Sequence, residues 1–197
     1  LHILPHWTWP GREGEVTPVF VYTNYPTAEL FINGKSYGKQ SKNNSSLKSR
    51  YRLMWMDAVY EPGEVKVVAY NKDGKAVAEK TVRTAGKPHH IELVSNRNEL
   101  TADGKDLAYV TVKVVDKDGN LCPTDSRLIH FSVKGAGKFR AVANGDPTNL
   151  EQFHLPKMHA FHGMLTAIVQ AGEIAGDLVL TAKASGVKTG TVHLQAK

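Results

Sequence analysis

Cysteine is almost absent from this chain, and its scarcity excludes two common ways of holding a small domain together. Cys122 is the single cysteine among 197 residues. One thiol can form neither an internal disulfide framework nor a cysteine-rich zinc site. With Pro123 beside it, we expect Cys122 to be a buried or half-buried small hydrophobe. Stability is therefore left to packed apolar surface.

Long apolar runs are also missing. No stretch approaches the roughly 18 residues that a membrane-spanning helix requires, so we expect no membrane insertion. The first residue is Leu1 rather than methionine, and no signal peptide is visible at the start. We interpret the sequence as an excised piece or a processed product of a longer protein.

No long segment has a helical period, and alternation with a period of two takes its place. Leu47, Tyr51, Leu53 and Trp55 are expected on one side of a strand, with cations on the other side. Other core faces are predicted at Val65, Val67 and Ala69, and at Ala108, Val110, Val112 and Val114. Later strands are predicted at Leu128–Val133, Leu165–Gln170, Asp177–Ala184 and Thr191–Gln195.

Turn residues that tolerate positive φ separate these runs. Asn33-Gly34, residues 71–74 and residues 116–119 suit tight hairpins. Many short strands joined by such turns are typical of an all-β sandwich or barrel. A break at residues 85–88 predicts two domains, at residues 1–86 and 87–197. The pattern loosens between residues 135 and 163, and a loop of that length is usually functional, interfacial or disordered.

The most specific segment lies at residues 6–24 and reads HWTWPGREGEVTPVFVYTN, followed at residues 28–38 by AELFINGKSYG. Two tryptophans flank one threonine, a Pro-Gly break follows, and an alternating strand comes next. This arrangement resembles the segment that follows the catalytic barrel in bacterial glycoside hydrolase family 2 enzymes of the β-galactosidase type.

A second resemblance follows in the expected order. Residues 100–116 read LTADGKDLAYVTVKVVD and resemble strands of bacterial immunoglobulin-like domains. Residues 144–148, then Glu151 and Phe153, and the stretch from Phe161 to Ala171 resemble the C-terminal sandwich of the same hydrolase family. Together the two resemblances cover nearly the whole chain. They imply an all-β fold of two tandem immunoglobulin-like β-sandwich domains.

The net charge of +6 raises the question of an anionic partner. Six cations fall in a window with no acidic residue between Glu29 and Asp57: Lys35, Lys39, Lys42, Lys48, Arg50 and Arg52. The simpler explanation is a solvated hairpin whose charges prevent edge-to-edge pairing with other chains. We therefore expect no nucleic-acid partner, with an anionic partner of another kind as the alternative.

Catalytic chemistry has no clear candidate in this chain. A typical glycosidase requires two carboxyl groups about 5 to 9 Å apart, one of them protonated. Glu13 and Glu15 lie among polar residues, where no apolar pocket can raise a pKa. In the resembled family the catalytic glutamates lie at barrel strand ends, and no barrel is present here. We expect no catalytic residue and no cofactor.

Histidines gather loosely in the same irregular region. His154, His159 and His162, joined by His130, are spaced so that imidazoles could ligate zinc. No acidic or cysteine ligand has motif spacing, so we favour a surface loop and expect no metal site. Asp146 is expected to accept hydrogen bonds from its own loop backbone.

Exposed tryptophans would provide flat surfaces on which sugar rings can stack. Trp55 alternates with core residues and is expected inside the first domain. Trp7 and Trp9 either pack beneath that domain, pack against a preceding barrel, or contact sugar. The candidate residues for carbohydrate or interdomain contact are Trp7, Trp9, Asn144, Asp146, Glu151, Phe153 and His154.

The resemblance implies a non-catalytic accessory role in a retaining β-galactosidase or a close relative. The chain would brace the catalytic barrel of its parent or shape the substrate entrance, with an oligo- or polysaccharide as a second partner. The periplasm or surface of a saccharolytic bacterium is the expected setting. Two alternatives stay open: a carbohydrate-binding module, which predicts aromatic residues projecting from one face, and an adhesin-like scaffold, which predicts further copies of the pattern at residues 100–119.

Overall fold

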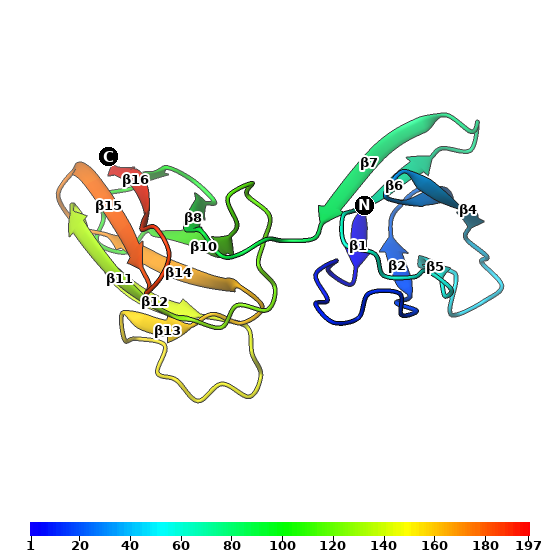
Figure 1. The fold of residues 1–197 in the computed structure, drawn as a ribbon. Coiled ribbons are helices and arrows are strands. Elements are labelled where there is room, and N and C mark those ends of the chain that lie inside the picture. Colours follow the sequence, from blue (N-terminus) through cyan, green and yellow to red (C-terminus); the bar gives the residue numbers. More distant parts are fainter. The chain divides into compact units, whose positions relative to one another are not determined.

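The computed structural model describes all residues 1–197, and every regular element in it is a β-strand. The chain divides into two compact units, Leu1–Thr84 and Ala85–Lys197, each built around its own apolar core (Figure 1). Each unit consists of two sheets. The expected all-β fold of two tandem immunoglobulin-like sandwiches is thereby confirmed. No helix is present that could cross a bilayer.

The first unit packs a three-stranded sheet on a four-stranded sheet. The smaller sheet has the order β1 (His2–Leu4), β2 (Val19–Tyr22) and β5 (Arg52–Trp55), and all its pairings are antiparallel. The larger sheet has the order β4 (Lys35–Ser41), β3 (Thr27–Ile32), β6 (Glu64–Tyr70) and β7 (Ala76–Arg83). Buried residues alternate along β3 and β6, as a half-buried strand requires.

The second unit is larger. One sheet has the order β12 (Gly137–Ala143), β14 (Met164–Ala171), β10 (Leu107–Val115) and β8 (His90–Ser95). The other has the order β13 (Lys157–His159), β11 (Leu128–Gly135), β15 (Gly176–Lys183), β16 (Gly190–Ala196) and β9 (Glu99–Leu100). The β16–β9 pairing is parallel, and the other ladders are antiparallel.

The predicted core faces are confirmed. The alternating residues of β6 and β10 are fully buried, and Trp55 and Cys122 are 1% and 3% exposed. All four later strands form, as β11, β14, β15 and β16. Burial, together with the neighbouring charges of Asp116 and Asp125, raises the pKa of the Cys122 thiol to about 11.

The prediction for Leu47 and Tyr51 is wrong. These side chains are 82% and 65% exposed, and β5 begins only at Arg52. The backbone before it is turned rather than extended, because the Arg50 amide donates to the Ser46 carbonyl and the Asn43 side chain accepts from the Ser45 amide. Alternation with a period of two therefore cannot continue upstream of β5.

Part of the irregular region also proves to be regular. Residues 137–143 form β12, which pairs with β14, and three further residues form β13. The register shifts between Phe139 and Ala141, which indicates a β-bulge at Arg140. An extra residue moves every later side chain to the opposite face, so this strand shows no clean alternation in the sequence.

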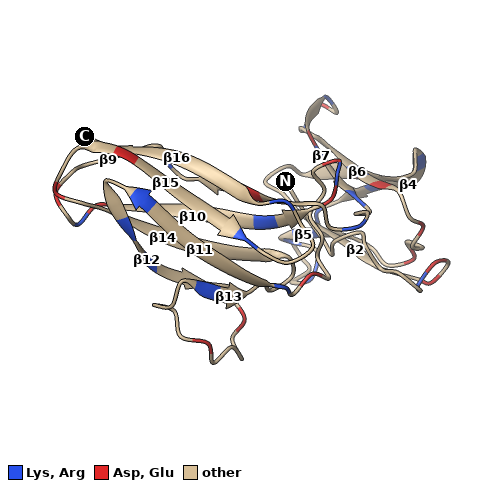
Figure 2. Ribbon diagram, turned by 60° about the vertical axis from the view of Figure 1, so that its left-hand side comes forward, with Lys and Arg blue, Asp and Glu red and all other residues tan.

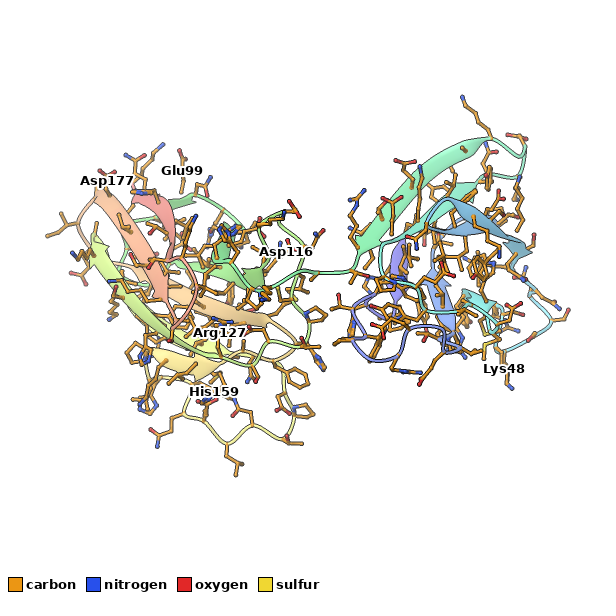
Figure 3. The ribbon with its side chains drawn as sticks, in the orientation of Figure 1. Lys48, Glu99, Asp116, Arg127, His159 and Asp177 are labelled. Atoms are coloured by element: carbon orange, nitrogen blue, oxygen red, sulfur yellow. The ribbon has the colours of Figure 1, made fainter.

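Asp116 fixes the turn between β10 and the segment that follows, and its side chain is labelled in Figure 3. It is 2% exposed, and its carboxylate accepts hydrogen bonds from the backbone amides of Gly86, Asp118 and Asn120 at 2.8–2.9 Å and from the Asn120 side chain at 3.0 Å. Burial alone would raise the pKa of Asp116, but these hydrogen bonds outweigh it and lower the pKa to about 2.

Candidate functional site

Trp7 is an anchor of the first core. Its side chain is 1% exposed, and its indole N–H donates to the Glu61 carbonyl at 2.9 Å. Its ring meets Tyr60 edge to face, with centroids 5.2 Å apart. The Thr84 hydroxyl donates to the Trp7 carbonyl at 2.6 Å, which ties the start of the unit to its end. Trp7 packs beneath the first domain and has no ring face left for a sugar.

Trp9 is half-buried beside it. The ring stacks on His6 with centroids 4.1 Å apart, and its indole N–H donates to the His6 carbonyl at 2.9 Å. The Trp9 amide donates to the Tyr60 hydroxyl at 3.1 Å, and the Arg12 guanidinium lies 5.5 Å from the ring centroid. A sugar stacked on the face that His6 covers would first have to displace the imidazole.

The loop after β12 is organised by two carboxylates. Glu151 accepts from the His159 amide at 3.1 Å, and its other oxygen lies 3.1 Å from Nδ1 of the same histidine. The Asn144 side chain donates to the His159 carbonyl at 3.0 Å. Asp146 accepts from the Thr148 amide and hydroxyl, and these bonds lower the pKa of Asp146. The expected loop-backbone bond of Asp146 is confirmed.

The remaining loop residues face solvent. Phe153 is 56% exposed, and His154 is also exposed. The histidines do not converge: no group of three His, Cys, Asp or Glu side chains is arranged to hold a metal ion. His159 pairs with Glu151, whereas His162 lies with Nδ1 3.2 Å from the Pro123 carbonyl. The structure thus brings Asn144 and Glu151 together around His159 and leaves Phe153 and His154 projecting.

The structure adds a surface that the sequence reasoning missed. It is the outer side of the sheet β1-β2-β5, which we call the aromatic–arginine face. Its strand residues are His2, Leu4, Phe20, Tyr22, Arg52 and Met54, all exposed or half-buried. The register places Tyr22 opposite Arg52 and Phe20 opposite both Met54 and Leu4. Charges of both signs occur on each unit, as Figure 2 shows, but no acidic residue belongs to this face.

Arg52 is the first residue of β5, an edge strand of this sheet, and its side chain contacts two aromatic residues of β2. Its Nη1 donates to the Tyr22 hydroxyl at 3.2 Å, its Nε donates to the Lys48 carbonyl at 3.2 Å, and its Cζ is 5.3 Å from the Phe20 ring centroid. In the neighbouring loop, Nε of Arg50 donates to the Asn44 carbonyl at 3.1 Å, and its Cζ is 5.8 Å from the Tyr51 ring centroid. In the sequence, the signal for this surface was the stretch between Glu29 and Asp57 that has six cations and no acidic residue.

Comparisons with known proteins give one consistent result. A family model described as "Glycoside hydrolase family 2 C-terminal domain 5" matches residues 91–193, more than half of the chain. A second model, described as "Domain of unknown function (DUF4982)", matches residues 14–78.

Among curated relatives, "Beta-galactosidase BoGH2A" of Bacteroides ovatus is 41% identical over 198 residues, covering 100% of this chain and 22% of the relative. A "Beta-galactosidase" of Thermoanaerobacter pseudethanolicus is 30% identical, covering 84% of this chain and 22% of the relative. A crystal structure of a β-glycosidase from Bacteroides vulgatus superimposes with a TM-score of 0.90 at 31% identity, over 99% of this chain and 24% of that one. The chain therefore spans about a quarter or less of the length of these proteins.

Proposed function

We propose that this chain, which belongs to glycoside hydrolase family 2 through the family's C-terminal domain, is an accessory part of a larger sugar-cleaving enzyme and braces its catalytic barrel. The observation that carries the proposal is coverage. The whole chain is similar to the β-galactosidase of Bacteroides ovatus, yet that similarity accounts for 22% of the relative. The remaining length is where a catalytic barrel would lie.

The first unit is built as a rigid support, which a bracing role requires. The segment around Trp7 and Trp9 is fixed by hydrogen bonds to Glu61, Tyr60 and Thr84, far along the chain. A buried aromatic that is also hydrogen-bonded cannot move without leaving polar groups unsatisfied. A barrel joined to such a segment would be held in a defined position.

The parent activity belongs to the same proposal. The names of the relatives support a β-galactosidase or a close relative such as a β-glucuronidase as the parent, and the proposal assigns it a retaining mechanism. The projecting side chains of Phe153 and His154 support a role for the second unit's loop in shaping the substrate entrance. A periplasmic or cell-surface location in a saccharolytic bacterium is part of the same proposal, for which the relatives support only the bacterial origin.

The test uses the full-length parent enzyme with and without residues 1–197. We expect the truncated enzyme to melt at a lower temperature and to lose kcat/KM for β-galactosides. Trp7→Ala in the intact enzyme should reproduce part of the loss, because it removes the anchor of the first unit. Tyr109→Ala, which removes an aromatic ring that is 45% exposed and contributes to neither core, is the matched control. Equal melting temperature and equal kcat/KM in the truncated enzyme would refute the bracing role.

A further inference from the structure

The first unit carries a concentration of positive charge that a bracing role does not use. Lys48 and Arg50 lie in the loop between β4 and β5, where Figure 3 labels Lys48, and Lys42 and Arg52 lie at the two ends of that loop. None of these four cations forms an ion pair. Lys42 instead donates to the backbone carbonyl of Thr23, next to Tyr22 of the aromatic–arginine face.

The two arginines differ from most others in the chain. Of seven arginines, four pair with a carboxylate: Arg12 with Glu15, Arg83 with Glu64, Arg97 with Asp106 and Arg127 with Asp125. Arg50 and Arg52 have only neutral partners, namely backbone carbonyls, a tyrosine hydroxyl and aromatic rings. Four of the other five arginines thus have a carboxylate partner, Arg140 being the exception, whereas both arginines beside this face have none.

Their geometry suits an external carboxylate. In both side chains Nε is occupied by a loop carbonyl, which fixes the plane of the guanidinium. The Nη2 atom of Arg52 and both Nη atoms of Arg50 have no protein acceptor. A guanidinium held in place in this way recognises planar carboxylates well, because its parallel N–H groups match the two oxygens.

Aromatic rings accompany these charges. Tyr22 is 37% exposed and Tyr51 is 65% exposed, although tyrosines usually bury much of their ring. The negative face of an aromatic ring attracts the polarised C–H groups on the flat side of a pyranose. Flat rings next to fixed guanidinium groups form a surface for a ligand made of sugar rings that carry carboxylates.

We propose that the aromatic–arginine face and the adjoining loop of residues 42–51 bind a carboxylated polysaccharide, a polymer of uronic acid units. Arg50 and Arg52 hold carboxylates, Tyr22 and Tyr51 stack on sugar rings, and Lys42 and Lys48 add attraction along the polymer. The choice of a sugar polymer rests on the proposed function; the choice of a carboxylated one rests on the unpaired arginines. A neutral glycan would leave those charges without partners.

Affinity electrophoresis of the chain in gels containing polygalacturonate tests the proposal. The same polymer with its carboxyl groups reduced to alcohols is the neutral control, and dextran sulfate and single-stranded DNA are the other polyanions. The variant Arg50→Gln with Arg52→Gln is compared with Arg140→Gln and Lys117→Gln. The control pair removes two exposed, unpaired cations from the second unit, so the net charges match.

We expect polygalacturonate to retard the native chain and the reduced polymer not to. The arginine variant should bind at least about tenfold more weakly, equivalent to about 1.4 kcal/mol, and the control pair should bind as the native chain does. Tyr51→Ala should also weaken binding without changing the urea midpoint. No retardation, equal losses in the two charge variants, or equal retardation by dextran sulfate or DNA would overturn the proposal. Because the parent barrel plays no part, this result is independent of the truncation experiment.

Discussion

Asp116 offers the sharpest test of the energetics of the second unit. Replacing it with alanine removes one buried carboxylate and leaves the Gly86, Asp118 and Asn120 amides without that acceptor. A lowering of the pKa from 3.8 to about 2, at about 1.4 kcal/mol per unit, corresponds to about 2 kcal/mol of stability at neutral pH. We expect Asp116→Ala to cost about 2 to 4 kcal/mol, since buried donors left without an acceptor add to the loss.

The pH dependence has a definite sign. The pKa is lowered in the folded state, so the contribution of Asp116 is fully present above about pH 4 and is lost as the pH falls toward about 2. The native second unit should therefore lose stability steeply in this window. In Asp116→Ala the free energy of unfolding should fall less steeply between about pH 4 and about pH 2, because the contribution of Asp116 is absent. The same slope in both proteins would contradict the assignment to Asp116.

The distribution of side chains provides separate probes for the two units. All three tryptophans, Trp7, Trp9 and Trp55, lie in the first unit, and the only thiol, Cys122, lies in the second. A short pulse of thiol reagent after equilibration in urea reports unfolding of the second unit, and tryptophan fluorescence reports the first. Asp116→Ala should lower the urea midpoint of labelling. Asp118→Ala, an exposed carboxylate two residues away, is the control and should stay within about 0.5 kcal/mol of the native protein. An unchanged labelling midpoint in Asp116→Ala would refute the reasoning.

Three further predictions follow from burial and backbone geometry. Native Cys122, buried and with a pKa of about 11, should react with thiol reagents at pH 8 roughly a hundredfold or more slowly than a free thiol, and labelling rates in water check this. Trp55→Ala should cost about 3 to 5 kcal/mol, seen as a lower urea midpoint by the fluorescence of the remaining tryptophans. Gly135→Ala should prevent the second unit from folding, because φ is +92° and an added Cβ would lie 2.0 Å from the Asp177 carbonyl oxygen. If Cys122 in that variant reacted with thiol reagents as slowly as in the native protein, this prediction would be wrong.

The sequence predicted those parts of the fold in which one face of a strand is buried without interruption. In β6 and β10 every second residue is buried. The alternation of apolar and polar residues in the sequence therefore matches the alternation of buried and less buried positions in the structure. β12 was missed because its bulge at Arg140 breaks the period, and the segment before β5 was assigned wrongly because its hydrogen bonds are local turns. A bulge depends on the partner strand, and these turns depend on local hydrogen bonds. The alternation of residue types in the sequence shows neither of them.

The candidate surface is visible only in part in the sequence. The absence of acidic residues between Glu29 and Asp57 is visible in the sequence, but its meaning depends on where each charge lies. Burial of Trp7 and the stacking of His6 on Trp9 remove the rings that seemed best suited to sugar. Tyr51, which the alternating pattern predicts in the core, is instead an exposed aromatic ring. The large apolar rings of Trp7 and Trp55 are buried in the first core, whereas Tyr51, between two arginines, stays exposed. In this chain, the sequence signal for the proposed surface is therefore a tyrosine between two arginines in a window without acidic residues, and not the tryptophans.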